Sequence, residues 1–163
     1  MKPLLVGEAN PYQSNEDDAM YFALHPDPPR ASGGRLCYFV MGLDERTYLR
    51  SYDRIDLCHP TFRLKNAKAK AEHLIRERTP EDVIVACGAK VAAAFGVPYW
   101  PFEIFNRLVE RSPERSPPLF PTHKVGAPCI VVIPHPSGLN RMWHEPNAVH
   151  RARAVLREAG VLQ

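Results

Sequence analysis

Short apolar runs alternate along the chain with stretches whose apolar residues recur at helical spacing. The runs typical of buried strands are residues 3–9, 54–58, 82–87 and 128–133. The stretches typical of helices are residues 16–24, 34–42, 45–51, 65–78, 89–95, 101–111 and 145–159. In the second of these helices, Leu36, Phe39 and Val40 share one face. Alternating strands and helices predict an α/β fold, a three-layer sandwich around a central, mostly parallel sheet of four strands.

Proline and glycine mark the connections between these elements. Residues 25–34 form a Pro/Gly-rich loop, and residues 98–124 form a proline-rich, aromatic connection. The second connection is long for so small a domain, and long loops usually carry function. We expect Pro146 to begin the last helix and Gly160 to end it, because these residues favour the two ends of a helix. With no internal repeat, residues 1–163 are expected to form one domain.

Composition and charge narrow the class of protein. Hydrophobic residues make up 45% of the chain and charged residues 24%, as is usual for a globular protein. No apolar run approaches the roughly 18 residues that a membrane-spanning helix needs, and the N-terminus lacks the layout of a signal peptide. We therefore expect a cytoplasmic protein without membrane contacts. The net charge of +3 mildly favours a polyanionic partner.

The cysteines give no support to a metal site. The four of them contain no C-x-x-C pair, and three lie in apolar, strand-like runs. We therefore expect buried free thiols, with neither a metal ion nor a cofactor.

Two strand ends carry the polar groups of greatest interest. The strand that ends at Ile133 is followed by Pro134 and then by His135-Pro136-Ser137-Gly138-Leu139. The strand that opens the chain runs into Gly7-Glu8-Ala9-Asn10-Pro11-Tyr12. Ligands of α/β proteins bind at the carboxyl ends of parallel strands. A His held there on a loop stiffened by two prolines is therefore a candidate functional group.

Together, and in this order, the two segments resemble the two active-site motifs of the uracil-DNA glycosylase superfamily. The first is similar to its Gly-Gln-Asp-Pro-Tyr and Gly-Glu-Ala-Pro variants, and the second to its His-Pro-Ser-Pro-Leu motif. The resemblance extends over most of the chain in the order of elements, but at residue level only over these motifs and the middle strand. It implies the same four-stranded, three-layer fold. It also implies hydrolysis of the bond between deoxyribose and a base flipped out of DNA, which leaves an abasic site.

The resemblance assigns catalytic roles position by position. A pocket that removes a base must stabilise negative charge on the departing base and place a water molecule below the sugar. His135 would donate a hydrogen bond to the pyrimidine O2 as charge develops there. Glu8 or Asn10 would orient the water, because the alignment of the first motif is ambiguous by one residue.

The same resemblance assigns contacts with DNA. Pro136 and Ser137 would contact the phosphate backbone, and Leu139 would fill the gap that the flipped base leaves in the stack. Arg141 would neutralise a phosphate. Arg63 and Lys65 lie at the start of a predicted helix. Two interpretations compete for them: contacts with phosphates, or an ordinary solvated helix face.

The chain departs from a uracil enzyme at the base-reading position. Uracil-specific members read the base with an Asn at the end of the middle strand, where this chain has Asp56. An ionised Asp only accepts hydrogen bonds, which suits the amino group of cytosine rather than the O4 of uracil. Alternatively, Asp56 caps a loop or pairs with an Arg. Residues 27–34 lack the stacking aromatic of that family's loop, so Tyr12, Tyr21 or Phe22 would stack on the base.

A cytosine reader must demand a modification, because removal of plain cytosine would destroy the host genome. Some superfamily members act in prokaryotic antiviral defence by excising glucosylated hydroxymethylcytosine from phage DNA. The sequence thus favours a monofunctional DNA glycosylase for a modified pyrimidine, with alpha-glucosyl-hydroxymethylcytosine as the best fit. We expect a monomer that needs no cofactor and acts on double-stranded DNA. The alternatives are a uracil-DNA glycosylase of base excision repair and a catalytically silent DNA-binding module on the same fold.

Overall fold

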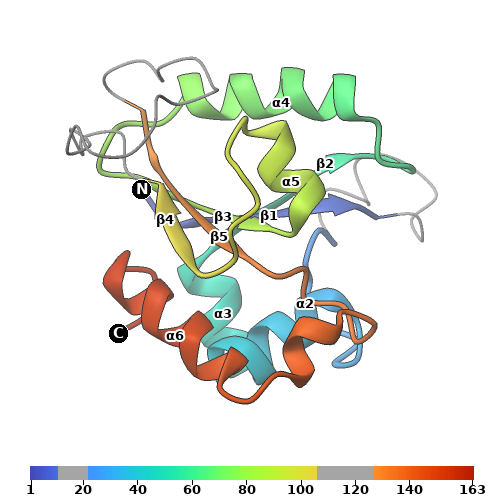
Figure 1. Ribbon diagram of the computed structural model, residues 1–163, viewed down its shortest axis with the longest axis vertical. Coiled ribbons are helices and arrows are strands. Elements are labelled where there is room, and N and C mark those ends of the chain that lie inside the picture. Colours follow the sequence, from blue (N-terminus) through green and yellow to red (C-terminus); the bar gives the residue numbers. More distant parts are fainter. Residues whose placement is uncertain (11–21, 106–126) are drawn as a thin grey trace.

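A mixed, mostly parallel sheet forms the centre of the protein (Figure 1). The computed structural model describes residues 1–10, 22–105 and 127–163. In this part of the chain the strands are β1 (Leu4–Ala9), β2 (Asp53–Cys58), β3 (Val83–Cys87), β4 (Glu103–Phe105) and β5 (Cys129–Ile133). They are ordered β2-β1-β3-β5-β4, and only β4 runs antiparallel to its neighbour. The carboxyl ends of the four parallel strands therefore meet at one edge of the sheet.

Helices cover both faces of this sheet, as the sequence predicts. The helices on one face are α4 (Leu64–Arg76) and α5 (Ala89–Ala94). Those on the other face are α2 (Ser32–Gly34), the π-helix η1 (Arg35–Met41), α3 (Glu45–Ser51), the 3-10 helix η2 (Arg141–His144) and α6 (Ala148–Glu158). Side chains alternate along the strands, so Leu5 belongs to the apolar cluster beneath α6, whereas Leu4 and Val6 pack with α4. Among the described residues, no helix is long and apolar enough to cross a bilayer.

The sheet has a fifth strand where the sequence suggested a helix. Residues 103–105 of the expected helix 101–111 form β4, and residues 106–111 lie outside the described part of the chain. Ile104 is in register with Val131 of β5. The expectation of four strands was wrong because pairing with β4 covers the free edge of β5, whose backbone groups would otherwise be exposed.

Two helical predictions also need correction. Of the expected helix 16–24, residues 22–24 form a turn, and the remainder lies outside the described residues. Phe39 does not share the buried face of Leu36 and Val40, because its side chain is 45% exposed. The reason is that η1 is a π-helix, whose wider turn changes the spacing at which side chains share a face.

The observed helix ends differ in part from the predicted ones, and the cysteines are free thiols. Helix formation starts at Ser32, inside the segment expected to be loop 25–34. The last helix begins at Ala148 rather than at Pro146, but Gly160 follows its end with a φ of 72°, as expected. The four cysteines are free thiols, as predicted, and three of them are buried, but Cys129 is only half-buried.

Two glycines of α2 lie where the loop that begins at residue 22 meets the helical segment of α2 and η1. Gly33 and Gly34 are buried, and a Cβ atom on Gly33 would collide with the backbone of Leu24 and His25. The same loop is held from the opposite side by the buried Tyr48, whose hydroxyl donates to the Leu24 carbonyl oxygen at 3.0 Å. The chain from residue 22 to residue 33 is thereby fixed as one wall at the carboxyl edge of the sheet.

We expect Gly33→Ala to lower the free energy of unfolding by about 2 kcal/mol or more. The added methyl group meets backbone atoms, which cannot move aside as a flexible side chain would. Urea unfolding measures the effect. Gly138→Ala is the matched control, because its methyl group would approach only the Arg35 side chain, no closer than 3.7 Å. Equal stabilities of the two variants would contradict this view of the wall.

Candidate active site

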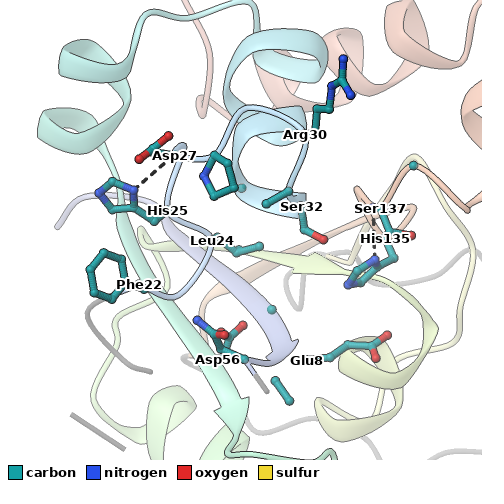
Figure 2. A pocket seen from close by; sticks show the side chains of 17 residues that line it. Glu8, Phe22, Leu24, His25, Asp27, Arg30, Ser32, Asp56, His135 and Ser137 are labelled. Atoms are coloured by element: carbon teal, nitrogen blue, oxygen red, sulfur yellow. Dashed lines mark hydrogen bonds between the residues drawn. The ribbon is translucent and has the colours of Figure 1, made fainter. Parts of the chain in front are cut away.

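A pocket of about 660 Å³ lies at the carboxyl ends of β1, β2 and β5 (Figure 2). Its lining includes Glu8 and Asn10 from the end of β1, Asp56 from β2, and His135 and Ser137 from the loop after β5. Residues 22–33 supply the facing wall. The structure therefore brings together the groups for which the sequence predicted base-binding and catalytic roles, although they are separated by up to about 130 residues in the chain.

The His135 side chain is fixed in one tautomeric state by its own loop. The backbone N–H of Ser137 donates to Nδ1 of His135 at 3.2 Å, so a neutral imidazole carries its proton on Nε2. The carbonyl oxygen of His135 accepts from Trp143 Nε1 at 2.8 Å and from Asn140 Nδ2 at 3.2 Å. Burial of the ring lowers its pKa, and the positive charge of Lys90 acts in the same direction, against the carboxylate of Glu8. His135 is thus a neutral hydrogen-bond donor at neutral pH.

The rest of this loop divides into buried and exposed parts. Pro136 is buried, and its carbonyl oxygen accepts from Arg35 Nε at 3.1 Å, so in this conformation Pro136 supports the loop from inside. Leu139 is 93% exposed and takes no part in the core. Ser137 lines the pocket, whereas Arg141 is exposed on η2. This leucine therefore projects into solvent from the loop whose residues His135, Ser137 and Gly138 line the pocket.

Glu8 and Asn10 both reach the pocket, so the structure leaves the water-orienting role open between them. Glu8 forms an ion pair with Lys90 of α5, with 2.9 Å between Oε2 and Nζ. The backbone carbonyl oxygen of Asn10 is 3.0 Å from Nδ1 of His59. Phe22 also lines the pocket, packed edge-on against His25, while Tyr12 and Tyr21 lie outside the described residues.

Two residues next to the site, Gly88 and Lys90, were not among the site residues predicted from the sequence. Gly88, between β3 and α5, has a φ of 105°, and a Cβ atom there would come within 3.0 Å of the His135 Cβ and 3.4 Å of Glu8 Oε1. Only glycine permits both this backbone conformation and this close approach. Lys90 follows in the first turn of α5. Both stand at the carboxyl end of a predicted strand, which was the available signal.

Asp56 is the buried polar group of the pocket. Its side chain faces the residues opposite on β1, where a Cβ atom on Gly7 would collide with Asp56 Oδ1. The residue is only 7% exposed. Burial raises the pKa of the carboxyl to about 7, with a further contribution from Glu8, although the charge of Lys70 opposes the shift. Lys70 itself donates to the backbone carbonyl of Asp56 at 2.9 Å rather than to the carboxyl.

The Asp56 carboxyl has no partner in the described part of the chain. The position lies within β2, and neither the loop cap nor the Arg partner considered from the sequence is found among the described residues. Buried polar groups are normally satisfied. A buried carboxyl that faces a pocket without a partner is therefore placed to meet a polar edge of a ligand. Because its pKa lies near neutrality, both its acid and carboxylate forms are populated, whereas the sequence suggested a carboxylate alone.

The basic residues after β2 lie outside the pocket. Arg63 occupies the position before α4, and Lys65 lies in its first turn, both exposed. They stand at the same edge of the sheet as the pocket but contribute nothing to its lining. Within the described residues, no group of three or more His, Cys, Asp or Glu side chains could hold a metal ion.

The chain matches no protein-family model, no curated protein and no solved structure.

We expect Asp56→Asn to stabilise the protein increasingly as the pH rises. Folding raises the pKa of Asp56 from an ordinary 3.8 to about 7, so the folded state holds a proton that the unfolded state has lost. Stability that depends on this proton is lost as the pH rises toward 7. The free energy of unfolding of the variant, relative to the wild type, should therefore be higher at pH 8 than at pH 5, by roughly 2 kcal/mol.

Urea unfolding at the two pH values measures this difference, and Asp44→Asn is the control. Hydrogen bonds from Thr47 lower the pKa of the Asp44 carboxyl, so its replacement should have the same effect at both pH values. A pH-independent effect of Asp56→Asn would mean that this carboxyl is solvated or paired.

Proposed function

We propose that the protein is a monofunctional DNA glycosylase of the uracil-DNA glycosylase type that releases a modified cytosine from DNA. The best candidate substrate is alpha-glucosyl-hydroxymethylcytosine in phage DNA, and the biological role is antiviral defence. One observation carries the proposal: a single pocket contains the Nε2–H donor of a neutral His135 and the carboxyl of Asp56, which has no partner among the described residues. A pyrimidine presents groups on opposite edges that these two side chains can bind at once.

His135 supplies the donor for the departing base. As the C1′–N1 bond breaks, negative charge develops on the base and is shared with O2. A neutral imidazole with its proton on Nε2 donates to this oxygen without losing the proton. Because Ser137 already holds the ring and Trp143 holds the backbone of His135, little reorganisation is needed when the charge forms. Such preorganised donors supply a large part of the catalysis in many enzymes.

Asp56 recognises the base and also supplies a proton to it. In its acid form the carboxyl donates to N3 of cytosine and accepts from the exocyclic amino group, which satisfies both of its oxygens. Cytosine is a poor leaving group as an anion. Transfer of the Asp56 proton to N3, as the electron pair of the C1′–N1 bond passes to N1, lets the base leave as a neutral molecule. Water then attacks C1′ and gives a proton to Glu8.

The size and lining of the pocket favour a substituent on the base. Its volume of about 660 Å³ lies in the range of roughly 300–1,000 Å³ that holds drug-sized ligands, more than a bare pyrimidine ring fills. Away from Asp56 the wall carries polar side chains, among them His25, Asp27 and Arg30 (Figure 2). Hydroxyl groups of a glucose unit need such donors and acceptors. Plain uracil uses neither the space nor these groups.

We expect His135→Ala to lower the rate of base release by roughly 100- to 1,000-fold, the scale of removing one such donor. The substrate is a duplex that holds glucosylated hydroxymethylcytosine, and alkali cleavage reveals the abasic sites. The affinity of the variant for DNA should change much less than the rate. His144→Ala, which removes an exposed histidine of η2, should keep the wild-type rate. A rate for His135→Ala within about threefold of wild type would exclude this residue from the reaction.

We expect Asp56→Asn to gain uracil excision and to lose activity on the modified cytosine. An amide donates to O4 and accepts from N3–H of uracil, but it has no proton to transfer to N3 of cytosine. The measurement compares duplexes that hold uracil, cytosine, hydroxymethylcytosine or its glucoside, treated with alkali after incubation. If the wild type releases uracil efficiently and ignores every cytosine derivative, the protein is a repair enzyme. Release of no base from any duplex would leave a DNA-binding module.

A further inference from the structure

We infer that Lys90 is a positioning residue that holds Glu8 in place and keeps His135 free to act as a neutral donor. The role of Lys90 in base release rests on the proposed function. The effect of Lys90 on the His135 side chain does not, because it follows from the charges around the imidazole and can be measured without a substrate.

The first part of the inference comes from the two oxygens of the Glu8 carboxylate. Oε2 is bound by Lys90 Nζ at 2.9 Å. Oε1 remains on the side of Gly88, within 3.4 Å of the place where a Cβ atom on that glycine would lie. The same place is 3.4 Å from Cδ2 of His135. One oxygen is therefore occupied, and the other stays beside the His135 ring, where it can accept from a water molecule.

Lys90 is itself held from two sides. It lies in the first turn of α5, directly after the close passage of Gly88 beside the pocket. Its ammonium group is also 5.6 Å from the centre of the Phe62 ring. A lysine that contacts both an aromatic ring and a carboxylate samples fewer positions than a free surface lysine. The ion pair thus has a defined geometry although the Lys90 side chain is 59% exposed.

The second part concerns the charges that face His135. Glu8, from β1, is the carboxylate whose charge favours protonation of the imidazole. Lys90, from α5, opposes this. Among the described residues, the Ser137 N–H donates to Nδ1, and Arg35 binds the neighbouring carbonyl of Pro136. His25, Asp27 and Arg30 line the pocket from the facing wall. Asp56 lines the same pocket from β2.

Loss of Lys90 would allow Glu8 and His135 to pair with each other, which would impair catalysis. A released Glu8 carboxylate next to an imidazole forms an ion pair with the protonated ring, which raises the pKa of the histidine. The two groups would then bind each other instead of the water and the base. Stability should hardly change, because ion pairs with exposed partners contribute only about 0–1 kcal/mol.

The test is an NMR titration of His135 in the intact protein. With Lys90→Met, the pKa of His135 should rise by roughly one pH unit, while Lys90→Arg should keep it near the wild-type value. Lys2→Met removes the same charge from the exposed N-terminus and serves as the control. In the double variant Glu8→Gln/Lys90→Met, the pKa should return toward that of the wild type, because both opposing charges are absent.

Base release provides the second readout. We expect Lys90→Met to lower the rate of release by roughly tenfold and to move the acid limb of its pH profile upward together with the pKa of His135. Lys90→Arg should keep both the rate of release and the acid limb of the pH profile near their wild-type values. An unchanged His135 pKa in Lys90→Met would overturn the inference, whether or not the protein releases a base. A raised pKa in a protein that releases no base would leave the inference standing and remove the proposed function.

Discussion

The structure of the site depends on a buried carboxyl that finds no partner within the described protein. Asp56 lies in the sheet itself, opposite Gly7, whose missing side chain leaves room for the carboxyl oxygens. Burial without a partner makes the charged form costly, which raises the pKa of this group to about 7. A carboxyl in that state both donates and accepts hydrogen bonds near neutral pH. It therefore suits the N3 and amino edge of a cytosine better than a permanently ionised aspartate would.

The opposite side of the pocket is organised by backbone contacts and by one ion pair. Gly88 lets the start of α5 pass close to both His135 and Glu8. The loop after β5 holds the His135 ring through Ser137, and Lys90 holds the carboxylate of Glu8. Each polar group thus has a fixed orientation before a ligand enters, and the energy of binding need not be used to order the site. The His135 and Glu8 side of the pocket is therefore preorganised.

Sequence patterns predicted the parts of this site that depend on local structure. The loop of His135 was found because a β-branched strand ends at Pro134, whereas Asp56, inside the apolar run 54–58, was found only through the resemblance to the glycosylase superfamily. The pattern could not show that β4 covers the edge of β5, since that pairing joins distant segments. It could not show the contact between Glu8 and Lys90, which are 82 residues apart. Nor could an assumed helical period predict the exposure of Phe39 on a π-helix.

The ionisation of Asp56 in the free protein tests this account most directly. The ¹³C chemical shift of the Asp56 side-chain carboxyl, assigned by comparison with Asp56→Asn, can be followed by NMR from about pH 3 to pH 9. A carboxyl that is buried without a partner should titrate with a pKa near 7. A pKa near the ordinary value of about 3.9 would show that Asp56 is solvated or paired, and would contradict its proposed role as the proton-bearing base reader.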